Sequence, residues 1–300
     1  MKERMYRRWS HYTCEDVQEI ADRTKPQQYT YTALGQGEFM PSFTEKLVGK
    51  HLEFRMDCGN VYTYYFASNH LLFWRKDNGE ERKEYYDALE LPEAPGLFLV
   101  QQFCMGSVPP TAHTLVLDCN TGLVTLCIAK AGMIAAEPRD ITREFFFGIT
   151  QGYQDMGERH SFTEDLVGTS IYWTYSVVRD IRIKHIYSSP RYYTYQMTNA
   201  KGQCWMATNP ADFLKIGEGF YVFSFLEDRQ VGTQGFFLIN MNTLHDVGSF
   251  FGIHAHGMES CMCAAVGELT SPYAFDWCET RSEPMRWSIH KNREMGKYEQ

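Results

Sequence analysis

The sequence predicts an all-β protein that consists of two tandem antiparallel β-barrels and a short N-terminal helix. The first observation is an internal repeat: the octapeptide SFTEKLVG at 42–49 returns as SFTEDLVG at 161–168, with seven of the eight positions identical. The second is a recurrence of stretches rich in Tyr, Phe, Val, Ile and Thr between turn signals such as 77–79 and 217–219. About eight strands can close into a barrel without exposed edges, so each repeat unit predicts one barrel.

The elements follow in chain order. The expected parts are an N-terminal helical extension (1–40), a first β-barrel (41–135), a linker (136–160), a second β-barrel (161–253) and a C-terminal extension (254–300). The helix is expected over 14–23, where Thr13 is a suitable N-cap. In the first octapeptide, Ser42 or Thr44 can cap a helical turn while Leu47 and Val48 close the barrel floor. Three consecutive phenylalanines at 145–147 are expected to pack between the barrels.

Composition and charge exclude several classes of protein. The 300 residues carry 29 Lys and Arg against 37 Asp and Glu, a net charge of −8 that repels a phosphate backbone. No apolar run approaches the roughly 20 residues of a membrane-spanning helix. The charged start has no apolar region after it, and the nine cysteines are an odd number. These features predict a cytoplasmic protein with reduced thiols and no nucleic-acid or membrane partner.

Several segments resemble one known family. The Thr-x-x-Leu-Val-Gly pattern, a Tyr-rich strand, the run Lys184-His-Ile-Tyr-Ser-Ser189 and Tyr193-Thr-Tyr195 resemble the C-terminal half of MoaF-like proteins. The first unit, through Tyr85 and the segment 114–118, resembles their N-terminal half, and the likeness covers about 35–253. The resemblance implies a pair of lipocalin-like (calycin) barrels, although the family's label invokes molybdenum cofactor biosynthesis. More distantly, phenolic acid decarboxylases and lipocalin-like natural-product cyclases are similar, which implies chemistry without a cofactor.

The segment 180–189 supplies the candidate catalytic group. With a period of two, Ile181, Ile183, His185 and Tyr187 share one mostly apolar face, which is expected to point into the second barrel. A histidine on that face is desolvated and can be tuned as an acid or a base. The alternative is a core histidine that a neighbouring carbonyl satisfies. We take His185 as the proton-transfer residue, with Tyr187 and Tyr175 as its catalytic partners.

Aromatic residues on the neighbouring strands complete the candidate site. Tyrosine hydroxyls can hold a phenolate, enolate or carboxylate while flat rings enclose the ligand, although the same stripe also suits an ordinary core. The candidate substrate-binding residues are Trp173, Tyr193, Tyr195, Trp205, Tyr221, Phe223 and Glu227. The first barrel has Tyr64 at the position of His185 and is expected to lack an imidazole. The second barrel is therefore the expected working unit, with the first as a scaffold or homodimer surface.

Three functions stay open from the residues alone. The first is a cofactor-independent enzyme that binds a small apolar or aromatic metabolite in a barrel and catalyses acid/base chemistry of a lyase, isomerase or cyclase type, such as dehydration, decarboxylation or cyclisation. No glycine-rich phosphate loop or G-x-S-x-G elbow occurs, so no cofactor is expected. The alternative is a non-catalytic lipocalin-like binding protein. The weaker alternative is a metal-dependent enzyme that uses His254 and His256 with Cys261 and Cys263, whose spacing does not match common zinc sites, so no metal is expected.

Overall fold

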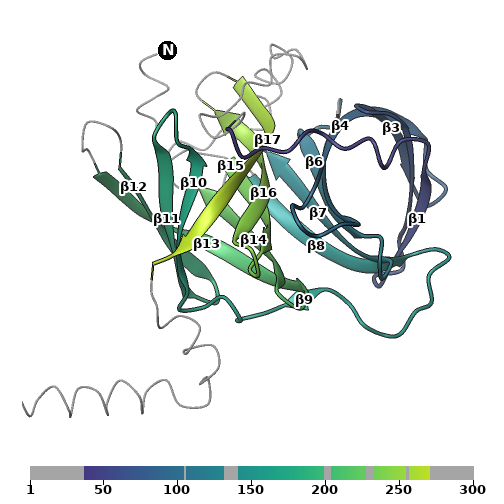
Figure 1. Ribbon diagram of the computed structural model, residues 1–300. Helices are drawn as coiled ribbons and strands as arrows, with labels where there is room; N and C mark the ends of the chain where they lie inside the picture. The colour runs from purple at the N-terminus through teal and green to yellow at the C-terminus, as the bar shows by residue number, and fades with distance from the viewer. Residues whose placement is uncertain are drawn as a thin grey trace, which may run out of the picture.

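The computed structural model describes residues 37–104, 106–131, 141–198, 204–227, 233–254 and 257–270. Every regular element in these ranges is a β-strand, and the strands form two antiparallel barrels that lie side by side (Figure 1). This arrangement confirms the predicted fold class. The helix expected over 14–23 lies outside the described residues, as does most of the segment 1–40.

The first barrel contains eight strands in simple up-and-down order. They are β1 (His51–Met56), β2 (Val61–Ser68), β3 (Leu71–Lys76), β4 (Arg82–Glu90), β5 (Leu97–Cys104), β6 (Thr111–Asp118), β7 (Leu123–Ala131) and β8 (Ile141–Thr150). Each strand pairs with the next, and Phe54 of β1 lies opposite Thr150 of β8, which closes the ring. Closure removes the exposed edges that an open sheet would present.

The second barrel repeats this order. Its strands are β10 (Ser170–Ser176), β11 (Ile181–Ser189), β12 (Tyr192–Thr198), β13 (Cys204–Gly217), β14 (Phe220–Glu227), β15 (Thr233–Asn240), β16 (His245–His254) and β17 (Gly257–Leu269). Pairing of β10 with β17 closes the ring, and the two-residue strand β9 (Ser161–Phe162) adds to β13 from outside.

Two expected boundaries were wrong. The segment 136–160, expected as a linker, contains β8, and the segment 254–300, expected as an extension, contains β17. Neither strand shows a clean alternation, because parts of both are covered on the lumen side and on the outer side. The phenylalanines at 145–147 are half-buried, and two of them, Phe145 and Phe147, do pack between the barrels as expected, although from a barrel strand rather than from a linker.

The repeated octapeptide forms the same floor in each barrel. The hydroxyl of Thr44 accepts a hydrogen bond from the Lys46 amide at 3.2 Å, as Thr163 does from Asp165 at 3.1 Å. Leu47 and its counterpart Leu166 are buried in the two lumens, whereas Val48 is exposed, so the expectation for Val48 was wrong. The floor is thus one leucine held by a capped turn.

The same backbone hydrogen bond follows the octapeptide in both halves of the chain. The amide of Gly49 donates to the carbonyl of Phe66 at 2.7 Å, and that of Gly168 donates to Tyr187 at 2.8 Å. Both glycines have φ near +80° to +90° (79° and 89°), a region that suits glycine. Matching bonds at matching positions support the duplication of the unit.

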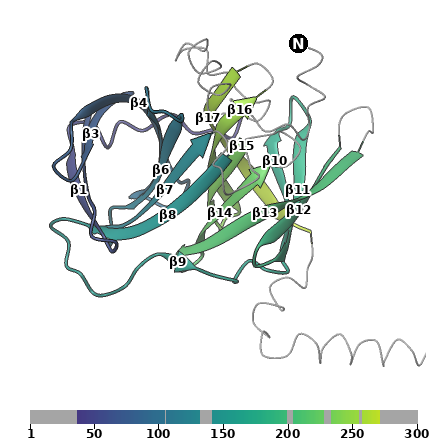
Figure 2. The same ribbon diagram turned by 180° about the vertical axis from the view of Figure 1, so that it is seen from behind.

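The outer faces of the two barrels pack against each other. Strands β6 to β8 of the first barrel lie beside strands β14 to β17 of the second, as the views from opposite sides show (Figures 1 and 2). Buried residues of β5 and β13 belong to the same clusters. We call this shared layer the wall. Its larger apolar cluster contains Leu99, Val116, Leu214, Val222 and Leu238, among others, all nearly inaccessible. Strands such as β5 and β15 are therefore buried on both faces along their length.

One ion pair crosses the wall. Arg143 of β8 donates to Oδ2 of Asp212 in β13 through Nε at 3.1 Å and Nη2 at 2.7 Å, and the Arg143 side chain is only 5% exposed. We expect Arg143→Ala to lower the free energy of unfolding by about 3 kcal/mol, because it leaves a largely buried carboxylate without its buried partner. The exposed Arg191, which contacts the other oxygen of Asp212, is the matched control, and Arg191→Ala is expected to cost about 1 kcal/mol or less. Urea unfolding of the two variants measures both values, and equal losses would contradict the assignment.

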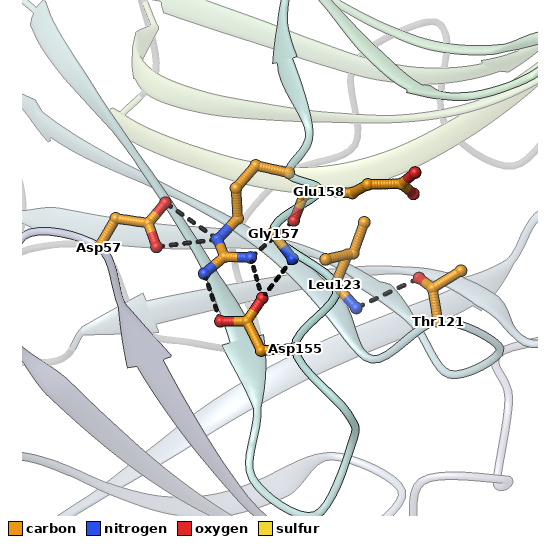
Figure 3. Close-up of polar contacts among 7 residues, drawn as sticks. Asp57, Thr121, Leu123, Asp155, Gly157 and Glu158 are labelled. Carbon is orange, nitrogen blue, oxygen red and sulfur yellow. Dashed lines mark hydrogen bonds and ion pairs between the residues drawn. The ribbon is translucent and has the colours of Figure 1, made fainter.

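The connection between the barrels is anchored to the first one. The guanidinium of Arg159 binds Asp57 and Asp155, each at 2.8 Å, and Figure 3 shows the two carboxylates pointing at it from different sides. The next residue, His160, is buried and its Nδ1 lies 2.8 Å from the hydroxyl of Thr125 in β7. These contacts hold the end of the segment 151–160 against the first barrel, directly before the second octapeptide begins.

Candidate functional site

Aromatic rings fill the lumen of the second barrel around one phenylalanine. Phe223 is fully buried, and its ring centre lies 4.6 Å from Tyr193, 5.0 Å from Tyr187 and 5.4 Å from His185. The rings pack this closely because a glycine lies opposite one of them. A Cβ on Gly235 would lie 2.3 Å from an atom of Phe225. The lumen is therefore a packed aromatic cluster rather than an open cage.

His185 lies inside this cluster, as its strand position predicts. It is 4% exposed, and its Nδ1 is buried without a hydrogen-bond partner among the described residues. Burial lowers the pKa of His185 to about 3, because a charged imidazolium would lose its hydration there. At neutral pH the ring is consequently uncharged and offers one unused polar atom to the lumen.

Two further polar atoms in the same lumen have no partner among the described residues. They are the hydroxyl of Tyr175 and Oδ1 of Asp246, and both side chains are buried. Asp246 faces the lumen because it pairs with Ile239 on one side and Ala265 on the other, which both belong to the aromatic cluster. Burial raises the pKa of the Asp246 carboxyl well above 3.8, against the opposing hydrogen bond from the Ala265 backbone.

The hydroxyls near Asp246 are also held neutral. Burial raises the pKa of Tyr175 well above 10, and the nearby Asp246 charge raises it further. The pKa of Tyr187 rises for the same two reasons, although the indole Nε1 of Trp173, which donates to the Tyr187 hydroxyl at 3.4 Å, opposes the rise. Burial thus favours the uncharged form of each of these groups, all of which can donate or accept hydrogen bonds.

The structure brings most of the predicted residues together. Those in the lumen cluster are Trp173, Tyr175, His185, Tyr187, Tyr193, Tyr195 and Phe223. Tyr221 packs at its edge, where its hydroxyl donates to Asp165 of the second octapeptide at 3.2 Å. Glu227 lies half-buried at the end of β14, close enough to raise the pKa of Tyr193. The side chain of Trp205 lies outside the described residues.

The first barrel also has an imidazole in its lumen. His113 of β6 is buried, its Nδ1 lies 2.9 Å from the hydroxyl of Tyr64, and its ring centre lies 4.5 Å from that of Trp74. Burial lowers the pKa of His113 to about 3, and the positive charges of Arg82 and Lys130 lower it further. The expectation that the first barrel lacks an imidazole was wrong, because the histidine comes from a different strand.

Comparison with known families follows the same division into two halves. A family model described as the MoaF N-terminal domain matches residues 28–132, and the MoaF C-terminal domain matches residues 160–272. The chain belongs to the MoaF family. The two MoaF domains correspond to the two barrels, and a MoaF fold of this kind is compatible with a barrel protein that binds a small molecule.

Other comparisons of this MoaF protein add little. No curated protein matches it. A solved structure of a protein of unknown function of the DUF3598 family from Nostoc punctiforme is similar at 10% sequence identity and a TM-score of 0.30, and the match covers 77% of this chain and 100% of the other. Among the described residues, no helix of the length and apolar character needed to cross a membrane occurs.

Asp246 is the functional candidate of this MoaF chain that the sequence did not indicate. It stands two residues before Gly248 and four before Phe250, so the period-two rule places all three on one face. Phe250 packs in the aromatic cluster, and this alternation was the available signal. It was obscured because the neighbouring Val247 and Phe251, whose side chains point to the other face, are equally buried, on the wall.

The metal alternative finds no support in the described part of this MoaF chain. Cys261 and Cys263 are buried in the aromatic cluster, and the side chains of His254 and His256 lie outside the described residues. Within the ranges that the structure describes, no three His, Cys, Asp or Glu side chains gather as metal ligands do.

Proposed function

We propose that the second barrel binds a small, largely apolar or aromatic molecule and moves a proton on it without a cofactor. The observation that carries this proposal is that Nδ1 of His185, the hydroxyl of Tyr175 and Oδ1 of Asp246 are all buried around one aromatic cluster and have no partner in the described part of the chain. A buried polar atom without a partner destabilises the fold by about 1–3 kcal/mol, and a ligand that forms the missing hydrogen bond removes this penalty. A ligand reaches these atoms by displacing rings around Phe223.

The pKa shifts of His185 and Asp246 have opposite directions, and they suggest which group acts as the base and which as the acid. Burial lowers the pKa of His185 to about 3, so the imidazole is an unprotonated base, and it raises the pKa of Asp246, which favours the protonated acid. Such a pair suits transfer of a proton to and from carbon beside an enol or carbonyl oxygen, with Asp246 or Tyr175 donating to that oxygen. Because none of these groups is cationic at neutral pH, a neutral ligand fits better than a carboxylate.

2-Naphthol is a suitable probe because it is flat, neutral and carries one hydroxyl. We expect it to bind, and we expect Tyr175→Phe to weaken the binding about tenfold while leaving the free energy of unfolding unchanged or higher, because the variant removes only an unpartnered hydroxyl. Tyr86→Phe in the first barrel, whose hydroxyl donates to Ser68, is the matched control and should keep the affinity. Fluorescence titration measures the affinity, and equal affinity in Tyr175→Phe and the wild type would refute this site.

A non-catalytic binding protein is the second candidate function. The observation that favours it is the low pKa of His185, about 3, which makes the ring a weak base. Exchange of the carbon-bound hydrogen at C1 of bound 2-naphthol with deuterated water separates the two. An acid/base enzyme accelerates this exchange and loses the acceleration in His185→Gln, whereas a carrier leaves the exchange rate unchanged.

A further inference from the structure

The lumen of the first barrel contains a polar layer that the proposed function does not use. Leu47 closes one end of this barrel, next to the bond between Gly49 and Phe66. Trp74 lies toward the other end, because it pairs with Arg82 at the start of β4. Arg82 is exposed, and its guanidinium carbon lies 5.8 Å from the centre of the Trp74 ring. The layer around Trp74 is therefore close to the end opposite Leu47.

Two buried atoms in this layer have no hydrogen-bond partner among the described residues. They are the donor Nε1 of Trp74 and the acceptor Oε1 of Gln102. Trp74 is 9% exposed and Gln102 is fully buried. The amide nitrogen of Gln102 is used, since it donates to Sγ of Cys104 at 3.5 Å.

Both unpartnered atoms belong to residues that surround the same imidazole. Gln102 pairs directly with His113 across β5 and β6, so the two side chains share the lumen face. The Trp74 ring meets the His113 ring at 4.5 Å and an interplanar angle of 68°. Tyr64 holds that imidazole through its hydroxyl at 2.9 Å, so the donor and the acceptor are presented from a fixed support.

Charges of both signs lie near this layer. Arg82 and Glu84 lie on the same strand and the same face, and they act on the pKa of Cys104 in opposite directions. Lys130, whose charge acts on His113 together with that of Arg82, is a second cation. The specificity of a site in this layer comes from the unpartnered donor and acceptor.

We propose that the first barrel holds a second ligand site, between Trp74, Gln102 and His113, for a small neutral molecule that carries a hydrogen-bond acceptor beside a donor. A lactam has this arrangement: its carbonyl accepts from the Trp74 indole and its N–H donates to the Gln102 carbonyl. The site is independent of the second barrel, because the two lumens are separated by the wall.

The test uses 2-pyridone, a flat lactam, and follows the indole N–H signals of the full-length protein by NMR. Trp74→Phe assigns the Trp74 signal, which we expect 2-pyridone to shift in a saturable way. N-methyl-2-pyridone keeps the carbonyl but lacks the N–H, and we expect it to bind about tenfold more weakly because Gln102 stays unpartnered. Absence of a shift up to the solubility limit, or equal affinity of the two compounds, would overturn the proposal.

Gln101 and Gln102 form a matched pair of variants on one strand. We expect Gln102→Leu to weaken 2-pyridone about tenfold and to abolish its advantage over the N-methyl compound. Gln101 faces the wall, where its Oε1 accepts from Thr114 at 2.6 Å, so Gln101→Leu should leave both affinities unchanged. Equal effects of the two variants would refute the site. If Gln102→Leu does not fold, the comparison of the two compounds on the wild type decides.

Tyr175→Phe should not change 2-pyridone binding, which keeps this result separate from the 2-naphthol experiment.

Discussion

Acidification from pH 6.5 to pH 4 is expected to lower the free energy of unfolding steeply, because three buried histidines gain protons on unfolding. Burial lowers the pKa of His113 and His185 to about 3 and that of His160 to about 4, from 6.5. The stability that each ring contributes is complete above pH 6.5 and is lost as the pH falls toward the folded pKa. Each contributes a slope of about 1.4 kcal/mol per pH unit, or about 4 kcal/mol for the three.

Asp246 acts in the opposite direction. Its pKa is raised well above 3.8 in the folded state, so its contribution is complete below that value and is lost as the pH rises toward the folded pKa. It therefore opposes the histidine slope, and the net slope is smaller than about 4 kcal/mol per pH unit. Urea unfolding between pH 4.5 and pH 6.5 measures this slope. His185→Gln should reduce it by about 1.4 kcal/mol per pH unit. An unchanged slope in His185→Gln would contradict a buried, neutral ring.

Phe223→Ala is expected to lower the free energy of unfolding by about 4 kcal/mol. The ring is fully buried at the centre of the aromatic cluster, and its removal leaves a cavity that the stiff neighbouring rings cannot fill. Phe223→Leu should retain most of the stability, and Val178→Ala, at an exposed position, should change it by about 0.5 kcal/mol or less. A loss below about 1 kcal/mol in Phe223→Ala would contradict the packed lumen.

The same variant offers a second measurement. A dry cavity lined by aromatic rings binds small apolar molecules, so benzene, which offers no hydrogen bond to the lumen, should stabilise Phe223→Ala more than the wild type. Thermal unfolding with and without benzene detects this difference. Equal stabilisation of both proteins would contradict a cavity created by the substitution.

The strands and the aromatic cluster of the second barrel could be predicted from the sequence where a strand has one buried and one exposed face. In β11 the exposed Arg182 alternates with the buried Ile181 and Ile183, so the period of two placed His185 and Tyr187 in the lumen. The octapeptide repeat supplied the two units independently of any strand pattern.

The residues that prediction missed lie on strands of the wall. His113 alternates with Leu115, but Ala112 and Thr114 between them are also buried, so β6 shows no polar face. Asp246 has the same problem in β16. Burial on both faces removes the contrast on which alternation depends, and the lumen side then cannot be identified without the pairing of the strands.

The wall gives the duplicated chain the organisation of a dimer. Phe103 and Leu226 occupy corresponding strands of the two halves and meet in one cluster, as do Val116 and Leu238 in another. Equivalent patches that cover each other are the mark of an isologous, two-fold interface. The chain therefore resembles a homodimer joined by the segment 151–160, in which each half covers the outer layer of the other.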